Sequence, residues 1–176
     1  MNGMASMILP ENIESIKDYA FYKCSGLKEL TLSDNVSFIG EGAFEKCSGL
    51  TYFNISAGID TLNSYLFYGC TALKNVVIPQ GVVQIRGSVF EKCTALETVI
   101  IPKSVTTIGE GSFLGCSSLR YVNIQNPEAG IGLGVFEGHG DAVEAKDYNK
   151  EKKPAIPMTT YDTTWPVSRP TIYVPE

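Results

Sequence analysis

Apolar and polar positions recur along this chain at a fixed interval of 23 residues. The five cysteines show the interval most plainly, because they stand at Cys24, Cys47, Cys70, Cys93 and Cys116. Phenylalanines follow it at positions 21, 44, 67, 90, 113 and 136, and aliphatic residues at Ile16, Ile39, Leu62, Ile85, Ile108 and Ile131. A repeat of this length is typical of solenoids and related arrays. The pattern therefore predicts one elongated domain of stacked coils.

Each repeat opens with the apolar spacing of one short strand. Residues two apart on a strand face the same side, so Val76 and Ile78 should point inward while Val77 points outward. A turn that often contains Pro or Gly follows, and then a second extended piece with its own apolar pair. The stretch 42–47 has apolar residues three and four apart, as in one helical turn. We therefore expect a strand, a turn, an extended piece and a brief helical turn in every coil.

The interval places seven short parallel strands, and the last of them is displaced. The next inner strand position, one period after Ile124, falls at 147, but residues 142–153 are charged and lack the pattern. Val174 fits instead, 27 residues late. We predict a solenoid of about six coils over 1–139, an insertion or capping segment over 140–170, and a final strand over 171–176. The strand centres are expected near Ile8, Thr31, Asn54, Val77, Ile100, Asn123 and Tyr173.

The repeat x-L-x-x-V-x-I-P-x-x-V-x-x-I-G-x-x-A-F-x-x-C resembles the BspA-type leucine-rich repeat, and residues 101–116 come close to it. The resemblance covers roughly residues 9–139. It implies an α/β, right-handed leucine-rich-repeat solenoid with one parallel sheet face and short helical turns. It also implies an extracellular or cell-surface protein of a host-associated microbe, of a kind that often adheres to other surfaces, and it brings no shared catalytic site.

One departure from ordinary leucine-rich repeats concerns the position after the strand, which is usually Asn. No ladder of Asn side chains is expected, because that position holds Asn35, Gly58, Gly81, Ser104 and Pro127.

Charge and composition narrow the classes of partner. The 176 residues carry a net charge of −5 with both signs scattered, which disfavours nucleic acid and a basic membrane-binding patch. No apolar run reaches the length of about 18 residues that a transmembrane helix needs. Residues 1–7 lack the charged segment and apolar core of a signal peptide, so the surface location is inferred from the resemblance alone.

The cysteines are expected to form a buried ladder of reduced thiols. Stacked, parallel side chains do not point at one another as a disulfide requires, and the number of cysteines is odd. No C-x-x-C pair suggests zinc, and we expect neither metal nor cofactor. His139 continues the cysteine column one period after Cys116, which is the pair that a thiol nucleophile needs. Both positions belong to the inward ladder and no third group orients the histidine, so we predict no enzyme.

The outward strand positions are the candidate binding site. One column contains Tyr52 and Tyr121, and the next contains Asn54, Val77, Ile100 and Asn123. Val77 and Ile100 should stack side by side and face solvent. They are either scattered surface residues, since β-branched side chains suit strands, or an apolar and aromatic patch for a protein or glycan. We expect a non-catalytic adhesion module; the alternative is a structural spacer without its own ligand.

The two ends of the array differ. Residues 140–170 either cover the open end of the core, with Trp165 packed on the last coil, or form a binding element. The opposite end has no evident cap. Either a longer protein supplies more coils there, or that end packs against another chain in self-association.

Overall fold

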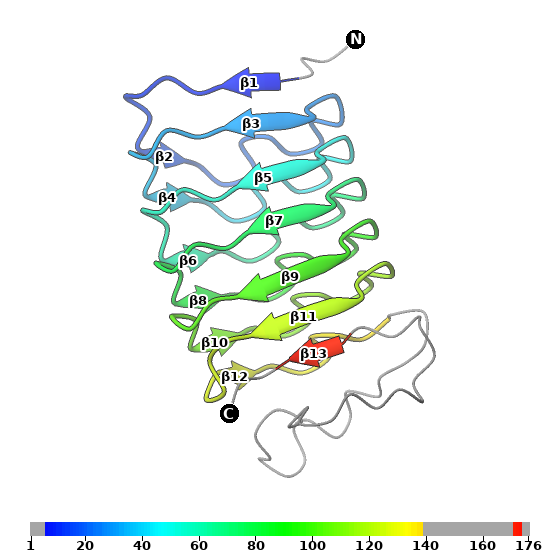
Figure 1. Cartoon of the computed structure of the whole chain (residues 1–176). Coiled ribbons are helices and arrows are strands. Elements are labelled where there is room, and N and C mark those ends of the chain that lie inside the picture. Colours follow the sequence, from blue (N-terminus) through cyan, green and yellow to red (C-terminus); the bar gives the residue numbers. More distant parts are fainter. Residues whose placement is uncertain (1–5, 139–170, 174–176) are drawn as a thin grey trace.

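A computed structural model of the chain describes residues 6–138 and the backbone of residues 171–173. The chain winds into a right-handed stack of coils (Figure 1). Each coil contributes one longer strand to the side that we call the long-strand face and one two-residue strand to the opposite, short-strand face. The longer strands are β1 (Ser6–Ile8), β3 (Glu29–Thr31), β5 (Tyr52–Asn54), β7 (Asn75–Val77), β9 (Thr98–Ile101), β11 (Tyr121–Ile124) and β13 (Thr171–Tyr173). The two-residue strands are β2 (Ser15–Ile16), β4 (Phe38–Ile39), β6 (Thr61–Leu62), β8 (Gln84–Ile85), β10 (Thr107–Ile108) and β12 (Gly130–Ile131).

The strand positions and the displaced seventh strand are confirmed. Neighbouring strands pair in parallel, and their register follows the repeat, as where Tyr52 lies opposite Asn75. β13 pairs with β11, with Tyr173 opposite Asn123, so one period and 27 further residues separate the two. The proposed insertion over 140–170, with Trp165, and the flanking His139 and Val174 lie outside the described residues.

The expectation of one sheet face was wrong, because both faces carry parallel strands and each is divided. The long-strand face consists of the sheets β1-β3-β5-β7 and β9-β11-β13. The short-strand face consists of β2-β4 and β6-β8-β10-β12. Each face therefore has one seam, between β7 and β9 on one and between β4 and β6 on the other (Figure 1).

A single side chain marks the seam on the short-strand face. In the neighbouring coils a backbone N–H bonds to the last carbonyl of the preceding short strand, as from Gly40 to the Ile16 carbonyl at 2.8 Å and from Arg86 to the Leu62 carbonyl at 2.9 Å. At the seam the Asn63 side-chain amide donates to the Ile39 carbonyl at 2.7 Å. The carbonyl is satisfied, but by a side chain that stands outside the strand ladder.

The predicted helical turns are also wrong: consecutive β-turns occupy those positions, and the described residues include no helix that could span a membrane. Backbone donors alternate along the stretch. The N–H groups of Glu45 and Cys47 bond three residues back within their own coil, to Gly42 and Phe44. The intervening N–H of Lys46 bonds to the Tyr68 carbonyl of the next coil at 2.7 Å. A helix would keep all these donors for itself, whereas the turns give every second one to the neighbour.

The turns need left-handed backbone at two positions in each coil. Glycine adopts this conformation without penalty, while other residues lose roughly 1–2 kcal/mol. The first position holds Gly42, Gly111 and Gly134 at φ from 58° to 61°, and the second holds Gly69, Gly115 and Gly138 at φ from 69° to 78°. Six other residues take the same positions with φ between 54° and 60°: Tyr19, Lys23, Lys46, Tyr65, Ser88 and Lys92. All six lie in the first four coils.

Side chains after the long strands brace the coils, although no continuous asparagine ladder forms among the described residues. Asn35 donates from Nδ2 to the Glu11 carbonyl at 2.8 Å, as the asparagines of ordinary leucine-rich repeats do. Ser104 donates its hydroxyl to the Val82 carbonyl at 2.6 Å. A hydroxyl and an amide thus serve the same purpose in different coils, because each only has to reach one carbonyl of the coil before it.

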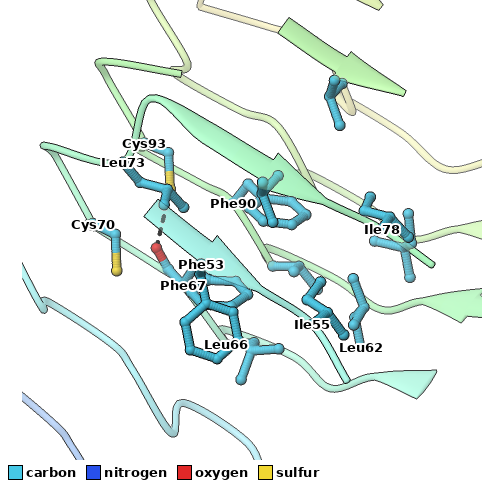
Figure 2. Packing of buried hydrophobic residues seen from close by; sticks show 14 of the residues in the cluster. Phe53, Ile55, Leu62, Leu66, Phe67, Cys70, Leu73, Ile78, Phe90 and Cys93 are labelled. Atoms are coloured by element: carbon cyan, nitrogen blue, oxygen red, sulfur yellow. Dashed lines mark hydrogen bonds between the residues drawn. The ribbon is translucent and has the colours of Figure 1, made fainter. Parts of the chain in front are cut away.

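The core is a set of identical side chains stacked along the axis. The phenylalanine column runs from Phe21 to Phe136 with ring centroids 5.1–5.7 Å apart and interplanar angles of 8–16°. Phe53, from the inner side of β5, packs at an angle between Phe44 and Phe67, with ring centroids 4.8 and 4.9 Å away. Figure 2 shows Phe53 beside Phe67. These rings are fully buried, whereas Phe21 in the first coil is only partly buried.

Truncation of the phenylalanine column should cost most in the middle. Phe67→Ala is expected to lower the free energy of unfolding by roughly 3–5 kcal/mol, because rings on both sides prevent the cavity from closing. Phe21→Ala should cost less, since that ring is partly exposed. Urea titration measures both, with Phe38→Ala as the control, because Phe38 is 46% exposed on β4. Equal costs at Phe21 and Phe67 would contradict stabilisation by neighbouring coils.

Candidate functional site

The predicted patch lies across the seam of the long-strand face. Tyr52 pairs with Asn75 on one side of the seam, and Tyr121 pairs with Thr98 on the other. In the next column Asn54 pairs with Val77, and Asn123 pairs with Ile100. The six predicted residues, Tyr52, Asn54, Val77, Ile100, Tyr121 and Asn123, therefore come from four successive strands and are arranged almost symmetrically about the seam.

Val77 and Ile100 form the centre of this patch. They lie on the neighbouring strands β7 and β9, and their side chains are 50% and 52% exposed. Tyr52 and Tyr121 flank them with 45% and 36% exposure. The side chains face solvent as expected, but the two central strands belong to different sheets. The patch is therefore less firmly joined at its centre than an unbroken sheet would be.

Asn123 supplies a polar group at the edge of the patch. Its Nδ2 donates to the Tyr121 hydroxyl at 3.4 Å, which links the two outward columns. Its Oδ1 is buried and finds no hydrogen-bond partner among the described residues. The arrangement offers aromatic, aliphatic and amide groups to a partner.

Four of the five cysteines form the predicted buried ladder, but Cys24 is exposed. Cys47, Cys70, Cys93 and Cys116 form no disulfide and are completely buried. Cys24 lies in the first coil, where no preceding coil among the described residues covers it, so the expectation that all five are buried was wrong. Each buried thiol donates to the carbonyl of the phenylalanine 26 residues before it, as Cys93 does to Phe67 at 3.1 Å (Figure 2). The corresponding distances are 3.0 Å for Cys47, 3.1 Å for Cys70 and 3.0 Å for Cys116.

The environment of the ladder opposes nucleophilic chemistry. Burial raises the pKa of the Cys47 and Cys116 thiols to about 12, from an ordinary 9.0, and raises the pKa of Cys70 and Cys93 well above that ordinary value. A reactive cysteine needs the opposite shift, because the thiolate is the nucleophile. The pairing of Cys116 with His139 cannot be placed, since His139 lies outside the described residues. Within the described part of the chain, no group of His, Cys, Asp and Glu could hold a metal ion.

A second surface escaped the sequence analysis. The turns after each two-residue strand, which we call the turn face, carry tyrosine pairs in alternate coils: Tyr19 with Tyr22, and Tyr65 with Tyr68, each pair with ring centroids 6.0 Å apart. Lysines lie over the rings of Tyr22 and Tyr68. Lys46 stands 5.6 Å from the centroids of both Tyr22 and Tyr68.

Two further lysines continue this row of tyrosine and lysine side chains on either side of Lys46. Lys23 lies 4.9 Å from the Tyr22 ring, and Lys92 lies 4.9 Å from the Tyr68 ring and donates to its hydroxyl at 2.6 Å. A longer interval in the sequence would have revealed the surface. Tyr19 and Tyr65, Tyr22 and Tyr68, Glu45 and Glu91, and Lys46 and Lys92 all repeat after two periods rather than one.

The first coil provides an open groove beside the edge strand β1. Ile8 is 79% exposed there, and Leu9, Glu11, Thr31 and Leu32 line the hollow together with residues 33–35.

These features define a parallel-sheet solenoid whose inward columns are committed to the core. The BspA type leucine rich repeat region family matches residues 2–120 and 48–141 in six copies. The chain belongs to this family of leucine-rich repeats. No curated protein matches the chain.

Solved structures agree with the family assignment. A leucine-rich repeat protein from Bacteroides ovatus superposes with a TM-score of 0.71 at 28% identity, over 76% of this chain and 35% of that protein. The leucine-rich repeat protein of T. pallidum gives 0.71 at 30% identity, over 78% and 66%. A leucine rich cell surface protein from Faecalibacterium prausnitzii gives 0.67 at 35% identity, over 68% and 32%. The chain thus spans from 32% to 66% of the length of these proteins.

Thiol reactivity should separate Cys24 from the ladder. In the native protein we expect one thiol to react rapidly with an aromatic disulfide reagent and four to react slowly, because four are buried. Unfolding in denaturant should release all five. Cys24→Ala should abolish the rapid phase and leave the slow one. A second rapid thiol in the native protein, or fewer than five reactive thiols without reductant after unfolding, would contradict the buried ladder of reduced thiols.

Alkaline pH should destabilise the fold through the same ladder. The thiol of Cys47 resists ionisation up to about pH 12 when folded, but ionises near pH 9 when unfolded. Its contribution is therefore complete below pH 9 and is lost as pH rises from about 9 to about 12. Between about pH 8 and pH 10.5, Cys47→Ala should lose about 2 kcal/mol less stability than the wild type. Urea titrations of Cys47→Ala and of the wild type at both pH values measure this difference, and the assignment is refuted if the two proteins lose equal stability.

Proposed function

We propose that this chain is a non-catalytic adhesion module of a surface protein and that its long-strand face binds a protein partner. The observation that carries the proposal is the exposed aliphatic pair Val77 and Ile100 between Tyr52 and Tyr121. β-branched residues suit strands in any case, but two neighbouring ones that are half exposed leave apolar area in contact with water. A partner that covers them removes that area.

The composition of the patch supports a protein rather than another ligand. Its centre is aliphatic and carries no charge, its flanks are tyrosines, and Asn54 and Asn123 add amide groups. Protein interfaces have this pattern, with an apolar, aromatic-rich centre that is depleted in charge and surrounded by polar groups.

The rigid scaffold is consistent with specific but weak binding of a partner. Strand backbones fixed by the coils on either side lose little entropy on contact with a partner. The apolar centre is small, so each copy should bind weakly, and several copies on a surface would add avidity. A surface location agrees with the description of the similar F. prausnitzii structure as a cell surface protein.

A structural spacer is the second candidate function, and Ile8 favours it. This residue is 79% exposed on β1 beside the groove of the first coil, where another chain could continue the stack. Self-association there would use the first coil and leave the patch around Val77 free. Sedimentation velocity with Ile8→Glu distinguishes the two functions, because only end-to-end association depends on this side chain.

Charge introduced at the patch should abolish binding. The wild type is first tested against a panel of immobilised extracellular matrix proteins. We expect the double variant Val77→Glu and Ile100→Glu to lose binding to every protein of the panel that the wild type binds, because two carboxylates would then have to be desolvated. Surface plasmon resonance measures the response. Both positions are half exposed, so the fold should tolerate the change.

A matched control places the same charges on the opposite face of nearby coils. Gln84 and Thr107 are exposed and pair with each other on β8 and β10. Gln84→Glu combined with Thr107→Glu should bind as the wild type does. If a partner is found and the Val77 and Ile100 variant binds it unchanged, the long-strand face is not the site. A wild type that binds glycans but no protein would reject the choice of partner.

A further inference from the structure

The turn face carries side chains that the fold itself disfavours. At the two left-handed positions of the last two coils every residue is glycine, namely Gly111, Gly115, Gly134 and Gly138. The first and third coils instead place Tyr19 and Tyr65 there, at φ 54° and 59°. A bulky residue in this conformation is an outlier, and such strain concentrates where function requires a particular side chain. Folding alone therefore does not account for these two tyrosines.

Tyr19 is held as a flat platform. Its ring covers the next coil at Gly42, because a Cβ at Gly42 would lie 2.3 Å from Cε1 of Tyr19. Its hydroxyl donates to Glu41 at 2.9 Å, which fixes the ring at its far end. Nearly half of the side chain, 46%, remains exposed. One side of the ring thus rests on backbone while a large part of it is open to solvent.

Tyr65 takes the same left-handed position two coils further along the axis, where Gly87 and Ser88 of the next coil stand in place of Glu41 and Gly42. Its side chain is 41% exposed, and it meets Tyr68 as Tyr19 meets Tyr22. Paired strands are about 4.8 Å apart, so two coils separate equivalent atoms by roughly 10 Å. This spacing matches the advance of two sugar units along an extended glycan chain.

The charges on this surface cancel locally. Lys46 lies 3.1 Å from Glu45, and Lys92 lies 3.5 Å from Glu91. An anionic ligand at Lys46 or Lys92, and a cationic ligand at Glu45 or Glu91, would meet an opposing charge beside the attractive one. The same groups offer hydrogen-bond donors and acceptors around the rings, which suits a ligand with many hydroxyl groups.

We propose that the turn face of coils one to three binds a neutral oligosaccharide, with Tyr19 and Tyr65 as stacking platforms for two of its sugar rings. The C–H bonds on one face of a pyranose carry partial positive charge and pack against the electron-rich face of an aromatic ring. The lysine, glutamate and tyrosine polar groups bind its hydroxyls. This site lies on a different surface from the patch around Val77 and Ile100 and does not depend on it.

The decisive variant replaces both platforms with the residue that the backbone prefers. Tyr19→Gly combined with Tyr65→Gly removes the rings and relieves the left-handed strain, so the melting temperature should stay close to that of the wild type. The probes are neutral hexasaccharides of glucose, mannose and N-acetylglucosamine, with a uronic acid hexasaccharide for comparison. Isothermal titration calorimetry on the whole chain should show binding to at least one neutral probe, weakened about tenfold or more in the double variant.

Ser88 provides the matched control, because it occupies the same left-handed position at φ 57° without an aromatic ring. Ser88→Gly should bind the neutral probe as the wild type does. The proposal is overturned if the wild type binds no neutral probe, if it prefers the uronic acid probe, or if the double variant binds unchanged. It is also overturned if the double variant unfolds as readily as Phe67→Ala, since the tyrosines would then serve the fold. The Val77 and Ile100 variant should retain glycan binding, so the two sites can fail separately.

Discussion

Each coil of this protein is completed by the next, and that dependence underlies the whole structure. Along the turns, every second backbone N–H is satisfied within the coil and the others reach carbonyls of the neighbour, as Lys46 reaches Tyr68. The side chains obey the same rule, since each phenylalanine ring lies against the ring of the following coil. No coil can satisfy its polar groups or bury its apolar ones alone, so the interval of the repeat must stay constant wherever the stack continues.

This constraint divides the positions of the repeat into two groups. Inward columns must keep nearly the same residue from coil to coil, which is why cysteine and phenylalanine recur without variation in the middle of the array. Outward positions are bound only by the backbone conformation that they occupy. Variation there therefore carries information, and it does so most strongly where a residue such as Tyr19 or Tyr65 opposes the local conformational preference.

The sequence predicts the strands well because the 23-residue interval and the alternation of strand side chains agree with each other. The displaced strand β13 followed from the same reasoning. The helical turns did not, because residues three and four apart share a face in consecutive β-turns as well as in a helix. At the seam beside Asn63, one side chain replaces a backbone donor. The repeat pattern of the sequence does not predict such a replacement.

The candidate sites show the same division. The outward columns of the long-strand face could be enumerated from the interval, so all six predicted residues lie together on that face. Their position across a seam could not be foreseen, because it depends on pairing between β7 and β9. Cys24 is exposed because it lies in the first described coil, and the repeat pattern alone does not distinguish that coil from the others. The tyrosines of the turn face repeat over two coils, and an analysis by single repeats does not detect them.

The two seams have a mechanical consequence, because they are staggered. Between β4 and β6 the opposite face remains joined through β3 and β5, and between β7 and β9 it remains joined through β8 and β10. Among the described coils, no two neighbouring coils are therefore unpaired on both faces at once. A pulling force along the axis would therefore encounter at least one intact strand pair at every level of the described coils.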